Sequence, residues 1–182
     1  MPCNSDYMES TSSEIDDVIK GTESLKVAVD ELVHYCDEVR DIIEAHLDDS
    51  TQELPQLTEG HVLAAAVEVQ IDKIKDKYAF RTGRGLAQDS AKSMFRVANR
   101  AIAQFARVNH AVTRLSRGEQ LEEGIIADLR QDQIQHRMGD MMRVYKHFAN
   151  KKVLTADEVA SVSNIDFTKP LTPQLGFDPD DV

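Results

Sequence analysis

Residues 87–115 read AQDSAKSMFRVANRAIAQFARVNHAVTRL, and this stretch decides the fold that we expect. Taken in alternating steps of four and three residues, it contains an unbroken apolar series: Ala87, Ala91, Met94, Ala98, Ala101, Phe105, Val108, Val112 and Leu115. This spacing is typical of a helix that buries one side against other helices. The stretch therefore predicts one long helix with an apolar seam.

The same stretch carries cations at steps of four and seven residues. We call these side chains the cationic ridge: Lys92, Arg96, Arg100, Arg107 and Arg114. At about 100° per residue they fall within a sector of roughly 80°, away from the seam, with His110 on the same face. One side of the helix is therefore expected to be buried while another presents positive charge.

Similar apolar seams predict further helices over residues 22–48, 59–80 and 119–151, with a short fifth helix over 155–162. Thr22 or Ser24 can cap the first helix, and Gly118 is placed to end the helix that contains the ridge. No stretch alternates with the period of a strand, and short connections favour antiparallel neighbours. We expect an all-α antiparallel four-helix bundle with long helices, a short fifth helix and extended tails.

The expected domain organisation has three parts. Residues 1–21 form a flexible acidic arm, 22–164 the helical bundle, and 165–182 an extended tail that contains proline and aspartate. In the 119–151 helix, the seam comprises Ile134, Met138, Met141, Tyr145 and Phe148. Met142 is expected to be partly exposed, and Gly139 to mark a close helix crossing.

Charge is segregated along the 182 residues, whose net charge is −11. Residues 1–72 carry 18 acidic and 3 basic residues, 73–117 carry 2 and 11, and 118–182 carry 12 and 7. The cationic ridge can therefore pair with carboxylates of the 22–48 helix, which is the interpretation we favour, or bind an anion or an acidic partner. Pairing of exposed charges contributes only about 0–1 kcal/mol each.

Arg81 and Arg84 flank Gly83 just before the long helix, in the sequence Arg81-Thr82-Gly83-Arg84-Gly85. Backbone N–H groups at a helix start, together with two arginines, can bind a phosphate. A turn with solvated charges is the alternative that we favour.

Arg130 is followed after five residues by His136, in the sequence Arg130-Gln131-Asp132-Gln133-Ile134-Gln135-His136. This segment resembles the motif of the HEPN-type RNases, which are helical bundles. The resemblance implies metal-independent RNA cleavage at a dimer interface, with His136 as acid and base and Arg130 at the phosphate. A particular polar residue usually follows the arginine in this motif. Here that position is occupied by Gln131, which is a departure from the motif.

The opening Met1–Glu9 resembles the starts of small uncharacterised proteins encoded by phages and bacteria. This resemblance implies at most a phage-like origin and carries over no fold, activity or site. Glu31 and His34 form the one Glu-x-x-His pair, whereas a di-metal bundle needs two such pairs and further glutamates. The pairs Glu122-Glu123 and Glu38-x-x-Asp41 resemble the helical nucleotide pyrophosphohydrolases, without their full set of magnesium-binding carboxylates. We therefore expect no metal and no cofactor.

These observations lead to two hypotheses. The favoured one is a non-enzymatic interaction protein that binds another protein, with a homo-oligomer as an open alternative; the opening resemblance adds an accessory protein of a phage that binds host or phage macromolecules. The second is a binder or processor of nucleic acid or nucleotide that uses the ridge, the Arg81–Arg84 turn, or Arg130 with His136. Two cysteines, and neither a signal segment nor a membrane span, predict a cytoplasmic protein.

Overall fold

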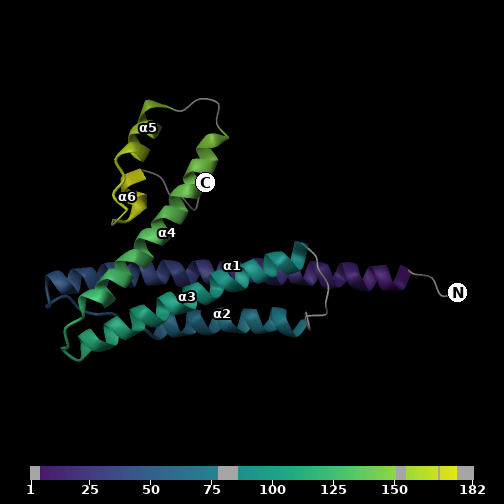
Figure 1. Cartoon of the computed structure of the whole chain (residues 1–182), viewed down its shortest axis with the longest axis horizontal. Helices are drawn as coiled ribbons and strands as arrows, with labels where there is room; N and C mark the ends of the chain where they lie inside the picture. Colours follow the sequence, from purple (N-terminus) through teal and green to yellow (C-terminus); the bar gives the residue numbers. More distant parts are fainter. Residues whose placement is uncertain (1–4, 78–85, 151–154, 168, 176–182) are drawn as a thin grey trace. The chain divides into compact units, whose positions relative to one another are not determined.

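The computed structural model describes residues 5–77, 86–150, 155–167 and 169–175. These residues form six helices and no strand (Figure 1), so the expected all-α helical bundle is confirmed. Contacts divide the chain into two units, Met1–Glu119 and Gln120–Val182.

Unit 1 consists of α1 (Ser5–Asp48), α2 (Thr58–Lys77) and α3 (Leu86–Ser116). α1 packs against both α2 and α3, and α2 also contacts α3. Successive helices run in opposite directions (Figure 1), as the short connections predict. The core consists of apolar side chains from all three helices, chiefly Leu25, Val29, Leu32, Cys36, Val39, Ile43, Val67, Ile71, Ile74, Ala98, Ala101, Phe105, Val108 and Val112.

The first helix starts much earlier than expected. α1 begins at Ser5, whereas the sequence suggested a flexible arm to residue 21 and a cap at Thr22 or Ser24. The seam continues upstream in steps of seven from Leu32 through Leu25 to Val18, which is 1% exposed, so packing supports the helix well before Thr22. Gly21 lies inside the helix, and a Cβ there would come within 3.0 Å of Ile74, so α2 packs closely against this turn.

The C-terminal end of α3 follows the expected pattern. Gly118 has a φ of +75°, a conformation that glycine adopts at little cost. The Glu119 N–H donates to the Arg114 carbonyl at 3.1 Å, and the Gly118 N–H donates to the Leu115 carbonyl at 3.0 Å. These two bonds form a Schellman motif, so Gly118 ends the helix as predicted.

Unit 2 consists of α4 (Glu123–Ala149), α5 (Ala156–Ser163) and α6 (Leu171–Leu175). α6 lies in the segment that was expected to be an extended tail. It is helical because Leu171 and Leu175, one turn apart, pack with Met141 and Val144 of α4 in a small apolar cluster. The partly buried side chains Phe148, Ile165 and Phe167 complete this cluster.

A single amide organises the turn before α6. Gln174 Nε2 donates to the carbonyls of Asp166, Lys169 and Pro170 at 2.9–3.2 Å, and its Oε1 accepts from the Asp166 N–H at 2.7 Å. The segment before α6 belongs to no strand or long helix, so its backbone N–H and carbonyl groups need other partners. The Gln174 amide supplies these partners. The segment from Ile165 to Leu175 therefore folds back on itself.

The predicted seam of α4 is wrong at two of its positions. Met138 is 52% exposed and Tyr145 is 54% exposed, although both were expected in the core. Met142 is 59% exposed, which agrees with its predicted exposure. Gly139 does not mark a close crossing, because a Cβ there would meet nothing within 4 Å. The side that α4 buries is shifted toward Met141 and Val144, since these residues face α6.

Candidate functional site

The exposed part of the cationic ridge is a row of three side chains on α3. Lys92, Arg96 and Arg100 are all exposed, and their steps of four residues place them over about 12 Å of helix. The seam residues of the same turns, Ala98 and Ala101, are at most 1% exposed. α3 therefore presents these cations to solvent because its opposite side is packed in the core of unit 1.

The pairing expected between the ridge and the carboxylates of α1 is not found for this row. Within the described part of the chain, no ion pair involves Lys92, Arg96 or Arg100. The acidic residue of α3 itself, Asp89, lies in its first turn, where the helix dipole favours a negative charge.

The other ridge residues have different surroundings. Arg114 is half-buried, and its Nε donates to Glu119 Oε2 at 3.1 Å, so this cation is paired with the connection that follows α3. Arg107 is half-buried and makes interactions of its own, while His110 is exposed. Arg81 and Arg84 lie outside the described residues. The open surface is therefore the N-terminal half of the predicted ridge.

A fourth cation lies beside this row. Lys75 of α2 is exposed, and its Nζ lies 5.7 Å from the centre of the Phe95 ring of α3. Such a cation–π contact contributes about 0.5–1 kcal/mol at an exposed site. Because Phe95 immediately precedes Arg96 and lies one turn after Lys92, Lys75 adds to the positive charge of this region.

Arg130 and His136 are not brought together on α4. A separation of six residues places them about 120° apart around a helix. His136 Nε2 lies 3.5 Å from Asp140 Oδ2, and Asp140 also accepts from Arg143. The imidazole thus belongs to a row of charged side chains along α4, while Arg130 is exposed on another face.

Other polar groupings identified in the sequence do not form a metal centre among the described residues. Glu31 is exposed on α1, whereas His34 is half-buried and already has interactions. Glu122 and Glu123 are exposed at the start of α4. These carboxylates are distributed over separate surfaces.

Sequence reasoning missed a buried arginine in the acidic helix α1. Arg40 is 2% exposed, with Nη1 3.4 Å from Gln104 Oε1 of α3 and Nη2 3.6 Å from Asp37 Oδ1. Paired guanidinium groups are the form in which arginine is buried, because an isolated buried charge is very costly. One feature of the sequence could have indicated this burial: Arg40 is the only lysine or arginine between Lys26 and Lys73.

A cluster of rings around Gly60 was also missed. Tyr35 of α1 is 8% exposed, its ring centre lies 6.4 Å from that of Phe105 on α3, and His61 meets Phe105 edge-on at 5.2 Å. A Cβ on Gly60 would overlap both the Tyr35 and the Phe105 rings. Gly60 is therefore the residue that lets α2 approach these rings.

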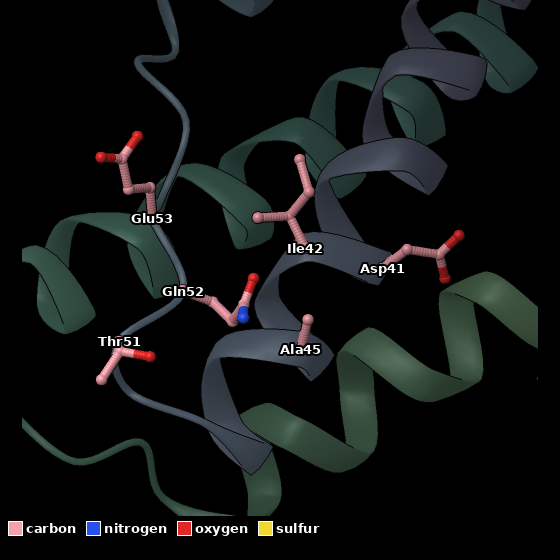
Figure 2. A pocket seen from close by; sticks show the side chains of 6 residues that line it. All are labelled: Asp41, Ile42, Ala45, Thr51, Gln52 and Glu53. Atoms are coloured by element: carbon pink, nitrogen blue, oxygen red, sulfur yellow. The ribbon is translucent and has the colours of Figure 1, made fainter.

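An open hollow lies where α1 meets the connection to α2. It is lined by Asp41, Ile42, Ala45, Thr51, Gln52 and Glu53, and Figure 2 shows the carboxylates of Asp41 and Glu53 pointing in different directions. Because these two acids do not converge, they lack the geometry of an acid–base pair or a cation site.

The connection below this hollow is held by local hydrogen bonds. Asp49 accepts from the Thr51 N–H at 3.0 Å and from the Thr51 hydroxyl at 2.7 Å, and His46 Nδ1 lies 2.7 Å from the Gln52 carbonyl oxygen. The bonds from Thr51 lower the pKa of Asp49, because they favour the charged carboxylate. This is an Asx-type turn, which explains how the chain reverses before Pro55.

Comparisons of the chain with protein-family models, with curated proteins and with solved structures find no match. None of the described helices combines the length and apolar character that a membrane span requires.

Proposed function

We propose that this chain is a non-enzymatic interaction protein whose α3 binds an acidic segment of a protein partner. The observation that carries this proposal is the row Lys92, Arg96 and Arg100, which is exposed and unpaired with carboxylates in the described part of the chain. A partner with acids at matching steps of four residues, as on an acidic helix, would present its charges at the same spacing.

The size and surroundings of the row favour a short acidic segment over a nucleic acid. About 12 Å of helix spans only a few phosphates, and log affinity for DNA rises with the number of phosphates neutralised. Val97, which is 44% exposed and follows Arg96, adds an apolar contact of the kind found in protein interfaces. The phenylalanines of α3, Phe95 and Phe105, are both buried, so neither is exposed for base stacking.

The charge of unit 1 outside this row also favours a compact partner. α1 exposes several carboxylates, including Asp16, Asp17, Glu23, Glu31 and Glu38. A long polyanion would be repelled by these groups, whereas a short acidic helix can lie on α3 alone. Charge complementarity of this kind chiefly determines the association rate and the choice of partner.

The experiment compares two probes of equal length and charge, an acidic helical peptide and a single-stranded oligonucleotide, at two salt concentrations. The variant Arg96→Gln/Arg100→Gln is expected to weaken peptide binding about tenfold, since each lost charge pair contributes about 0.5–1 kcal/mol. The matched control is Lys20→Gln/Lys26→Gln, which removes two exposed cations of α1 and is expected to leave binding unchanged.

Three outcomes would contradict the proposal. They are tighter binding of the oligonucleotide than of the peptide, equal effects of the two double variants, and RNA degradation by the wild type but not by His136→Ala. The last result would instead support the catalytic hypothesis based on Arg130 and His136.

A further inference from the structure

α2 has an apolar face that lies opposite to its core side. Val62 is 63% exposed and Val69 is 50% exposed, and Ala65 and Ala66 between them are also exposed. At 100° per residue these four side chains share a sector of about 100°, centred roughly 150° from the buried Val67. An isolated exposed valine needs no explanation, whereas four apolar residues on one helix face form a continuous strip.

Two opposite charges lie on the same side of the strip's midline, one before and one after its centre. The centre lies between Ala65 and Ala66, because Val62 and Val69 are equally distant from that point. Glu59 precedes the centre by about six and a half residues, and Lys73 follows it by about seven and a half, on the same side of the strip. Both side chains are exposed.

This arrangement matches the strip to an antiparallel copy of itself. In an antiparallel pair of helices, residues before the centre face residues after it on the same edge. Val62 then meets Val69 of the second copy, and Glu59 meets Lys73, each contact occurring twice. The other edge places His61 near Asp72 of the second copy in the same way. A parallel pair would instead place the Glu59 edge of one copy beside the His61 edge of the other, so Glu59 and Lys73 would not meet.

We propose that α2 is a self-association surface through which two copies of this chain form an antiparallel, two-fold symmetric dimer. Ala65 and Ala66 at the centre allow close approach of the two helices, because interaxial distance depends on the side chains at the contact. The strip is short, so the dimer belongs with weak, transient interfaces that bury less than about 1,200 Å².

The decisive experiment is a charge exchange followed by sedimentation equilibrium of the full chain, from low micromolar to near-millimolar concentration. Glu59→Lys alone and Lys73→Glu alone are each expected to weaken dimerisation about tenfold, because both symmetric pairs become repulsive. An equimolar mixture of these two variants is expected to recover the wild-type affinity as a heterodimer. The double variant Glu59→Lys/Lys73→Glu is expected to recover it as a homodimer.

Two further variants separate the face from general surface effects. Val69→Glu places a carboxylate in the strip and is expected to weaken dimerisation more than tenfold. Val27→Glu changes a valine of comparable exposure, 58%, on α1 and is expected to leave it within twofold of the wild type. Circular dichroism melting of each variant shows that the helices remain folded.

Several results would overturn the proposal. They are a monomeric wild type throughout the concentration range, failure of the mixture to recover affinity, and equal effects of Val69→Glu and Val27→Glu. Binding of a different protein by this face, with the chain monomeric, would also overturn it. The outcome is independent of whether α3 binds an acidic partner.

Discussion

Gly60 in α2 and Gly139 in α4 are both glycines inside long helices, but their surroundings are opposite. A Cβ on Gly60 would overlap the rings of Tyr35 and Phe105, whereas one on Gly139 would meet nothing within 4 Å. The aromatic side chains of the two units differ likewise, with Phe105 5% and Tyr145 54% exposed. The helices that contain these residues all carry apolar residues at steps of three and four. Such a pattern identifies a helix, while the neighbouring elements decide which side is buried.

The largest contrast is expected between Phe105→Ala and Tyr145→Ala. Phe105→Ala leaves a cavity among the rings of unit 1 and should lower the free energy of unfolding by about 3–5 kcal/mol. Tyr145→Ala removes an exposed ring and should change it by no more than about 0.5 kcal/mol. Urea unfolding followed by circular dichroism measures both. Equal losses would show that Tyr145 is buried in solution.

The same substitution at the two glycines should have opposite effects. Gly60→Ala forces a Cβ into the Tyr35 and Phe105 rings and should cost about 1–3 kcal/mol of unfolding free energy. Gly139→Ala replaces glycine in an open helix interior and should add about 0.5–1 kcal/mol. Thermal unfolding of both variants tests this. A stabilising Gly60→Ala, or a destabilising Gly139→Ala, would contradict the packing described for α2 or α4.

A smaller effect is expected at high pH from Tyr35. Burial raises the pKa of its phenol, an effect partly opposed by the backbone N–H of Gly60. Since the folded pKa exceeds the unfolded value of about 10, its contribution to stability is complete below that pH and is lost as the pH rises toward the folded pKa. Wild type should therefore lose stability above about pH 10 more steeply than Tyr35→Phe.

Ultraviolet absorbance gives an independent measurement of the same group. The difference in phenolate absorbance between wild type and Tyr35→Phe should titrate above the pKa of an unconstrained tyrosine. A midpoint at or below that value would mean that Tyr35 is solvated, and that α2 does not cover it at Gly60.

Much of unit 1 could be predicted from its sequence. The steps of four and three through Ala98, Ala101 and Phe105 identify both the helix and its buried side, because long helices pack against it over much of its length. Gly118 could be assigned as a helix end because few other residues adopt positive φ there. The exposure of Lys92, Arg96 and Arg100 follows from the same periodicity.

The remaining features depend on contacts that no single stretch contains. Met138 was assigned to the core because its period matches Met141, but within unit 2 the packing of α6 is at Met141 and Val144. Gln174 organises its turn through three carbonyls, which depends on a backbone path unknown from the sequence. The burial of Arg40 depends in part on Gln104, which is 64 residues away. Charge segregation suggested pairing of the ridge with α1, yet Lys92, Arg96 and Arg100 form no ion pair within the described part of the chain.

The most direct test of the central claim, that α3 buries its seam and presents its cations, is the maleimide reactivity of single cysteines along two turns of this helix. Cysteines are introduced at Arg96, Ala98, Arg100 and Ala101 in a Cys3→Ser background, in which the native Cys36 is buried. We predict rapid labelling of Arg96→Cys and Arg100→Cys in the folded protein, and protection of Ala98→Cys and Ala101→Cys until the protein is unfolded. Rapid labelling at Ala98 and Ala101, or protection at Arg96 and Arg100, would contradict the account.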